Sequence, residues 1–248
     1  MDVKFRCAAA LAEMLPRPRP AKEMIPPWLR AMPARAFSEV HGRPIRTVKQ
    51  CPPFVDAMGH GFMILLPCDV RVDNGVFTWD WPLPALSVEK HPRAPLSFHG
   101  PEQVAATPFD AGGRVVIKFN SFWTIELEPG YSLFATHPVN RDDLPFRLIT
   151  GMVDADRFVD VGINFPAMWL DQEFSGVLAR GTAIAQCFPV PRVALELDVA
   201  TLTAADGARY DELATSILEA PGVYRKRFRD RASRSRRQMP PKGLKVEP

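Results

Sequence analysis

Short apolar runs, rich in β-branched and aromatic residues and separated by turn signals, follow one another through the middle of this chain. Residues 62–66 are continuously apolar, which predicts a strand that is buried on both faces. The sequence Asp73-Asn74-Gly75 is a turn signal, and it predicts a hairpin whose second strand starts at Val76. Short strands at this spacing indicate a mostly β protein with a closed or sandwiched core. Further strands are expected at 114–120, 122–127, 131–136, 146–149, 159–165 and 184–188.

We expect this core to extend over residues 51–200, with an irregular insertion at 81–113. Before it, residues 1–50 contain an edge-strand pattern and a proline-rich segment with at most one helical turn, which predicts an extended arm that packs on the core. After it, apolar residues at helical spacing within 201–223, preceded by the capping residues Thr203 and Asp206, predict a helix that docks on the core. Residues 224–248 are expected to form a basic, flexible tail.

Composition narrows the class of protein. Hydrophobic residues make up 46% of the 248 residues, which is ordinary for a globular protein, and no apolar run approaches the roughly 18 residues of a membrane span. The first residues lack the apolar region and the cleavage site of a signal peptide, so we expect a cytoplasmic protein without a membrane partner. The 4 cysteines form no C-x-x-C pair and are expected to be free thiols.

The positive charge of the chain is concentrated near its end. The net charge is only +3, but residues 225–237 are mostly Arg. Such a segment cannot bury a core, and it fits either a solvated tail or a segment that binds nucleic acid through its charge.

Three ordered elements between residues 114 and 192 resemble the dUTPase and dCTP-deaminase superfamily. Residues 151–154 match its G-x-I-D element, residues 181–186 match its G-x-x-I-A-Q element, and residues 127–131 resemble the Pro-Gly turn before its phosphate-binding strand. The resemblance implies a β-clip or distorted jelly-roll core. It also implies a homo-oligomer, because relatives of this kind are usually trimers with sites between subunits.

The chain as a whole is similar to an uncharacterised family of bacterial and phage proteins. The stretches that carry this similarity are PAKEMIPPWL, KQCPPFVDAM, NSFWTI and THPVNR. This similarity implies no activity.

The superfamily resemblance also suggests a site. By position, the Asp of the G-x-I-D element is Asp154, which the resemblance implies would position an attacking water as a general base. The Arg-Ser phosphate element would fall at 138–141, where this chain reads Pro-Val-Asn-Arg, and the glycine-rich C-terminal motif is missing, so a working dUTPase is not expected. The candidate catalytic residues are Asp154 and His137, and the candidate ligand-binding residues are Asn140, Arg141, Arg157 and Gln186.

Two of these residue groups have alternative roles. Arg141 fits a forked contact with a carboxylate or phosphate, and it fits equally a local pair with Asp143. Hard cations prefer clustered carboxylates, so a divalent metal could be held by a set drawn from His60, His137, Asp154 and Asp156. Solvated carboxylates and histidines with backbone hydrogen bonds are the structural alternative.

Two functions fit these patterns. In the first, the protein binds or acts on a small anionic, nucleotide-like molecule in a pocket near His137, Asn140, Arg141 and Asp154. In the second, it is a non-catalytic structural or assembly protein of phage origin. A metal-dependent, oxygenase-type enzyme with His and Asp ligands is a further alternative.

Overall fold

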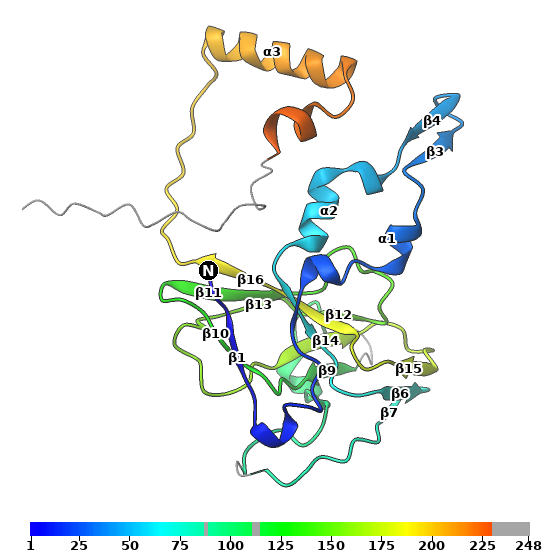
Figure 1. The fold of residues 1–248 in the computed structure, drawn as a ribbon, viewed down its shortest axis with the longest axis vertical. Coiled ribbons are helices and arrows are strands. Elements are labelled where there is room, and N and C mark those ends of the chain that lie inside the picture. The colour runs from blue at the N-terminus through cyan, green and yellow to red at the C-terminus, as the bar shows by residue number, and fades with distance from the viewer. Residues whose placement is uncertain (87–88, 111–114, 230–248) are drawn as a thin grey trace, which may run out of the picture. The chain divides into compact units, whose positions relative to one another are not determined.

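The computed structural model describes residues 1–86, 89–110 and 115–229 (Figure 1). The chain divides into two compact units, Met1–Ala194 and Leu195–Pro248. Within the described residues, every strand belongs to the first unit. The part of the expected basic tail at 230–248 lies outside the described residues.

Three antiparallel sheets form the body of the first unit, so the prediction of a mostly β protein is confirmed. Their strands are β2 (Arg19–Pro20), β5 (Phe62–Leu65), β6 (Val70–Asp73), β7 (Val76–Thr78), β8 (Leu96–Phe98), β9 (Val116–Phe119), β11 (Tyr131–Thr136), β12 (Phe146–Leu148), β13 (Gly151–Val153), β14 (Phe165–Trp169), β15 (Gly176–Leu178) and β16 (Ala183–Pro191). The five-stranded sheet has the order β13-β11-β16-β5-β2, the four-stranded sheet β12-β14-β9-β8, and the three-stranded sheet β15-β6-β7.

One apolar core joins the three sheets. It takes Leu133 from β11, Trp169 from β14 and Val72 from β6, and all three side chains are buried. Alternation sets which side chains enter it: on β6 the valines are buried while Arg71 and Asp73 are exposed.

Strand β5 is buried on both faces, as its apolar run predicts. Phe62 and Ile64 face the main core. Met63 and Leu65 face the other way and pack against Ala21 of the N-terminal arm. The arm thus covers the outer face of this strand.

The arm also contributes strands and short helices. Strand β1 (Lys4–Arg6) pairs with β10 (Thr124–Glu126), and β2 pairs with β5. Helix α1 (Pro27–Ala31) is the single turn expected around Trp28. The arm continues into a hairpin of β3 (Arg35–Ser38) and β4 (Arg43–Arg46). Single turns of 3-10 helix lie at Ala9–Leu11, Ala21–Glu23, Val48–Gln50 and, later in the chain, Pro101–Val104.

One helix was not predicted, and one predicted strand was wrong. Residues 52–59 form helix α2 (Pro52–Gly59), because prolines suit the first turn of a helix, where the N–H groups have no helical partner. Residues 159–164 form no strand, since the backbone N–H groups of Arg157 and Phe158 fold back onto the carbonyl of Asp154 as a turn. The strand in this region is β14, which begins only at Phe165.

The second unit contains the predicted C-terminal helix, α3 (Ala204–Glu219). Thr203 caps it: its hydroxyl accepts from the Asp206 N–H at 3.2 Å, and the Asp206 carboxylate accepts from the Thr203 N–H at 3.0 Å. None of the residues of α3 is buried. A short turn at Tyr224–Phe228 follows. Among the described residues, none of the helices has the length and apolar character of a membrane span.

Candidate functional site

Asp154 lies directly after β13, beside the start of β11. The register pairs Leu133 with Val153, which places Ser132 next to Asp154. The Ser132 hydroxyl donates to Asp154 Oδ1 at 2.7 Å, and Arg192 Nη1 donates to the same oxygen at 3.3 Å. The carboxylate is therefore held in place by two donors, while 51% of its side chain stays exposed.

Asp156 and Arg192 form the main ion pair of this region. Arg192 Nη1 lies 2.8 Å from Asp156 Oδ1, and its second terminal nitrogen bonds the other carboxylate oxygen. The Gly130 N–H also donates to Asp156 at 2.9 Å. These bonds from Arg192 and Gly130 hold the pKa of Asp156 well below its usual range. The pair joins the end of β16 to the turn after β13, and the Gly130 bond adds the turn before β11, so both side chains serve the fold.

His137 lies beyond the other end of β11 and is partly buried. Its Nε2 donates to the Arg141 carbonyl at 2.9 Å, and its Nδ1 accepts from the Leu148 N–H at 3.3 Å. These partners define a neutral ring with its proton on Nε2. Burial lowers the pKa of His137, which favours the same neutral state. Both ring nitrogens are occupied, so neither is available to a metal or a substrate.

The structure does not bring Asp154 and His137 together, which corrects the expected pocket. Asp154 bonds Ser132 near the start of β11, whereas His137 follows the strand's last residue, Thr136. At about 3.3 Å per residue, the two side chains are on the order of 15 Å apart. Within one chain they cannot act on the same atom.

Asn140 and Arg141 form a turn near His137. Asn140 has a φ of 58°, in the left-handed region that asparagine tolerates in turns. Arg141 makes a forked pair with Asp143, with nitrogen–oxygen distances of 2.7 and 3.0 Å. Of the two roles open to Arg141, the structure shows the local pair. Against the opposing effect of burial, the bond from Arg141 and, more weakly, the nearby Trp28 of the arm hold the pKa of Asp143 below its usual range.

Gln186 is fully buried and uses its whole side-chain amide. Its Oε1 accepts from the Val139 N–H at 2.9 Å, and its Nε2 donates to the carbonyls of Ala57 and His60 at 2.9 and 2.7 Å. It therefore joins the turn after β11 to the end of α2. By contrast, Arg157 is exposed and has no side-chain hydrogen bond or ion pair with the described residues.

The metal-site candidates are separated in the same way. The His60 ring stacks on Phe188 at a centroid distance of 5.6 Å, far along the sheet from Asp156. Over residues 1–86, 89–110 and 115–229, no three His, Cys, Asp or Glu side chains are placed to share a metal ion. The cysteines of the chain are free, and burial raises the pKa of Cys68 to about 11.

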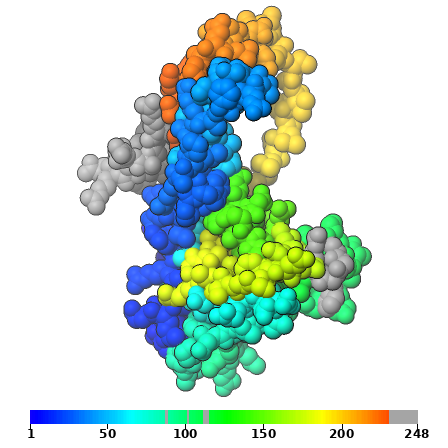
Figure 2. Space-filling view, turned by 90° about the vertical axis from the view of Figure 1, so that its right-hand side faces the viewer, coloured from blue at the N-terminus to red at the C-terminus, as the bar shows by residue number. Residues whose placement is uncertain are grey.

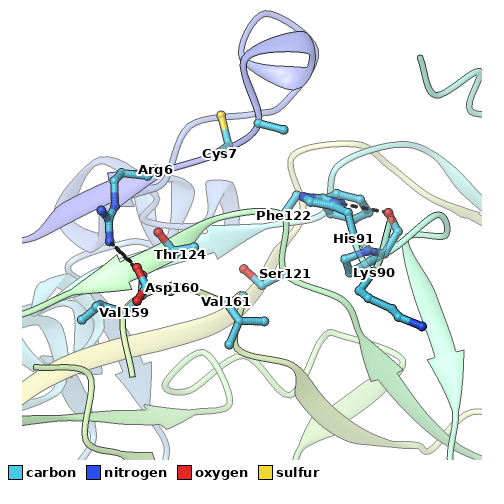
Figure 3. Close-up of a pocket in the computed structure, with 13 residues that line it drawn as sticks. Arg6, Cys7, Lys90, His91, Ser121, Phe122, Thr124, Val159, Asp160 and Val161 are labelled. Atoms are coloured by element: carbon cyan, nitrogen blue, oxygen red, sulfur yellow. Dashed lines mark hydrogen bonds and ion pairs between the residues drawn. The ribbon is translucent and has the colours of Figure 1, made fainter. Parts of the chain in front are cut away.

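A cavity of about 390 Å³ lies elsewhere, where β1 and β10 meet two irregular segments (Figure 3). It is within the usual size range of small-molecule sites, at the lower end. Most of its wall is apolar, and basic groups outnumber acidic ones. The lining residues are Arg6, Cys7, Ala8, Lys90, His91, Pro92, Ser121, Phe122, Thr124, Val159, Asp160, Val161 and Gly162.

One hydroxyl of this cavity has no partner. Thr124 Oγ1 is buried and makes no hydrogen bond with the described residues. The neighbouring Ser121 hydroxyl is already used, because it donates to the Trp123 carbonyl at 2.7 Å. The wall beside Ser121 is tight: a Cβ on Gly162 would lie 2.3 Å from the Ser121 carbonyl oxygen, so only glycine fits there.

The charges of the cavity are only partly paired. Arg6 lies 3.6 Å from Asp160 and donates to the Val159 carbonyl at 2.9 Å. His91 Nδ1 donates to the Pro92 carbonyl at 3.0 Å, and its ring lies 5.3 Å from that of Phe122. Within the described residues, neither His91 nor Lys90 has an acidic partner. The cavity therefore combines an apolar wall, an unpaired hydroxyl and two basic groups without a counter-charge.

Sequence reasoning missed this cavity because its residues come from four separate segments and form no motif. Lys90 and His91 fall in the insertion at 81–113, and Arg6 and Cys7 fall in the arm. Neither a protein-family model nor a curated protein sequence matches the chain. Function is therefore inferred from the side chains alone.

Proposed function

We propose that this protein binds a small anionic molecule with an apolar body in the cavity of Figure 3. The observation that carries this proposal is the buried, unpartnered Thr124 hydroxyl in a cavity whose opposite side is lined by Lys90 and His91. An unpaired buried hydroxyl costs about 1–3 kcal/mol, which a ligand acceptor or donor would offset. The basic groups favour a negative charge on the ligand, and the Phe122 ring and Val161 favour an apolar body.

The proposal keeps the small anionic ligand expected from the sequence and moves its site. Asp154, His137 and Gln186 are bound to Ser132, Leu148 and Val139 respectively, so they support the fold and not a dUTPase reaction. We propose that the antiparallel sheets form a β-clip or jelly-roll core. We also propose that the protein acts in the cytoplasm. The oxygenase-type alternative gains no support from the described residues, which present no set of three metal ligands.

Thermal melting of the full-length protein tests the proposal with benzoate, phenyl phosphate and uridine monophosphate as probes. A probe at a hundredfold excess over its Kd is expected to raise Tm by about 5 °C or more. Thr124→Val and Lys90→Gln should abolish the rise. Arg157→Gln removes an equal charge from an exposed site outside the cavity and should leave it intact. Flat melting curves for all three probes, or an unchanged rise in Thr124→Val, would overturn the proposal.

A second candidate, an assembly protein of phage origin that forms a homo-oligomer, is favoured by the segment after β16. Val193, Leu195, Leu197 and Val199 are 66–93% exposed and alternate with polar residues from Glu196 on. This alternation is typical of a half-buried strand, yet residues 192–203 pair with no strand in the described part of the chain. In this proposal the segment adds as a strand to a sheet edge of a second copy.

Native mass spectrometry of the full chain tests the assembly candidate. We expect an oligomer that Leu195→Glu with Leu197→Glu converts to monomer, because charges then occupy the apolar face. The matched control, Glu196→Lys with Asp198→Lys, changes the polar face and should stay oligomeric. A monomeric wild-type protein at high concentration, or a double-leucine variant that remains oligomeric, would contradict this candidate.

A further inference from the structure

The hairpin of β3 and β4, residues 35–46, stands apart from the sheets of the core. Its strands pair with each other and, within the described residues, with no other strand. Almost all of its strand residues are exposed on both faces. In Figure 1 it extends beyond α1 and α2, away from the core strands, and in Figure 2 the lighter blue residues of the arm lie above the green and yellow core. We call residues 35–46 the basic hairpin.

The base of the basic hairpin is held by groups other than its arginines. Lys49 Nζ donates to the carbonyls of Arg30 and Met32 at 2.6 and 2.8 Å. Thr47 Oγ1 donates to the Pro33 carbonyl at 2.6 Å, and Gln50 Nε2 donates to that of Ala34 at 3.0 Å. An isolated hairpin is only marginally stable, and these bonds fix where it leaves the arm.

Arg35, Arg43 and Arg46 have no structural partner. None of them forms an ion pair or a side-chain hydrogen bond with the described residues. Arg35 lies directly opposite Arg46 in the ladder, an arrangement of like charges that destabilises a strand pair. The acid of the basic hairpin, Glu39, lies at its tip. The repulsion between Arg35 and Arg46 is not offset by any ion pair with the described residues. We infer that these cations face an anionic partner.

The geometry distributes the three cations over both faces of the ribbon. Alternate residues of a strand point to opposite faces, so Arg46 faces one way with its partner Arg35, and Arg43 faces the other way. Phe37, 68% exposed, lies on the face of Arg35. A partner must therefore present negative charge to both sides of a two-stranded ribbon.

We propose that the basic hairpin binds duplex DNA by entering the major groove. The major groove admits a two-stranded β-ribbon, and its two phosphate walls offer anions to both faces. The major groove of A-form RNA is too narrow and deep for such a ribbon, so duplex RNA should bind more weakly. An anionic lipid surface fits less well, because it would meet the tip first, where the carboxylate of Glu39 would be repelled.

Fluorescence anisotropy with a labelled 20-base-pair DNA duplex tests the proposal on the full-length chain. The test variant is Arg35→Gln, Arg43→Gln and Arg46→Gln together. The matched control is Arg17→Gln, Arg71→Gln and Arg157→Gln, three exposed arginines of the first unit outside the basic hairpin. Both variants lose the same charge and keep the C-terminal basic tail, so a difference between them depends on position.

The hairpin variant is expected to bind at least tenfold more weakly at 50 mM salt. The slope of log K against log salt should be shallower by roughly 3, about one for each lost phosphate contact. The control should keep most of its affinity, and replacing the three hairpin arginines by lysine should restore binding. Equal losses in both variants, tighter binding to single strands or to phosphatidylserine vesicles, or no DNA binding by the wild type would each overturn the proposal. Unchanged melting curves show that the variants fold.

Discussion

The region around Asp154, where the sequence predicts a site, and the cavity of Figure 3 each contain a buried hydroxyl, and the two hydroxyls differ in their hydrogen bonds. The Ser132 hydroxyl donates to Asp154 at 2.7 Å and accepts from Arg192 at 3.3 Å. The Thr124 hydroxyl, in the cavity of Figure 3, has no partner among the described residues. Both lie in β-strands of the first unit, yet only one belongs to a completed network.

The same contrast holds for the charged and amide groups around them. Near β11, Arg192 is paired with Asp156, Arg141 with Asp143, and Gln186 uses both ends of its amide. Around the cavity, Lys90 and His91 lack an acidic partner in the described residues. Polar groups that complete each other stabilise the fold, whereas groups left open are free to select a ligand.

Gln186 gives the largest expected effect on stability. Gln186→Ala leaves the Val139 N–H and the carbonyls of Ala57 and His60 without partners in a buried place. We expect a loss of about 3–5 kcal/mol in the free energy of unfolding, measured by urea denaturation. Gln50→Ala, which removes a single bond at a partly exposed site, should cost less than about 1 kcal/mol. Similar losses in both variants would show that Gln186 does not anchor the fold.

Loss of the Arg192–Asp156 ion pair should have the second largest effect on stability, and it is measured through the dependence of Tm on acid pH. Because the folded pKa of Asp156 is depressed below its usual 3.8, its contribution is present above about pH 4 and is lost as the pH falls further. Asp156→Asn should lower Tm at pH 7 and flatten the decline of Tm below pH 4. The control is Asp160→Asn, since that carboxyl is 89% exposed and lies 3.6 Å from Arg6. If Tm declines below pH 4 in Asp156→Asn as steeply as in the wild type, a carboxyl other than Asp156 causes the acid sensitivity.

The sequence predicts the β-rich core better than it predicts the site. Periodicity finds β5, β11 and the hairpin at Asn74-Gly75 because burial and turn chemistry are local. It misses the partner of Asp156, because Arg192 lies 36 residues away and meets it only through the pairing of β11 with both β13 and β16. Local pattern does not encode which distant strands become neighbours.

The expected convergence of Asp154 and His137 in one pocket is absent for a related physical reason. The resemblance places Asp154 and His137 at one site, but the length of β11 separates their side chains. The cavity in Figure 3 assembles Arg6, Lys90, Thr124 and Asp160 from four segments, so no spacing rule connects them. An unpaired hydroxyl is visible only once all its neighbours are placed.

Removing the Ser132 and Thr124 hydroxyls in separate variants tests directly whether one is bonded and the other is not. Ser132→Ala should destabilise the protein by about 1 kcal/mol, because it deprives Asp154 of a donor. Thr124→Val removes a hydroxyl that has no partner at nearly constant volume, so its stability should stay the same or rise by up to about 1 kcal/mol. Urea denaturation of both variants measures this difference in sign. A loss in Thr124→Val as large as in Ser132→Ala would mean that Thr124 is structurally bonded, and the cavity would lose its strongest support as a ligand site.

Replacing His137 should have the smallest effect on stability. The pH dependence of that effect distinguishes a structural histidine from a catalytic one. Burial depresses its folded pKa below the usual 6.5, so the unfolded chain binds the proton more readily. The stability it contributes is therefore complete above about pH 6.5 and declines as the pH falls below that value. In His137→Gln this decline in Tm should be shallower, while His41→Gln, at an exposed turn, should keep the wild-type slope. A slope that His137→Gln leaves unchanged would mean that His137 carries its proton at little cost in the fold, and the role of an acid or base would then be open to it again.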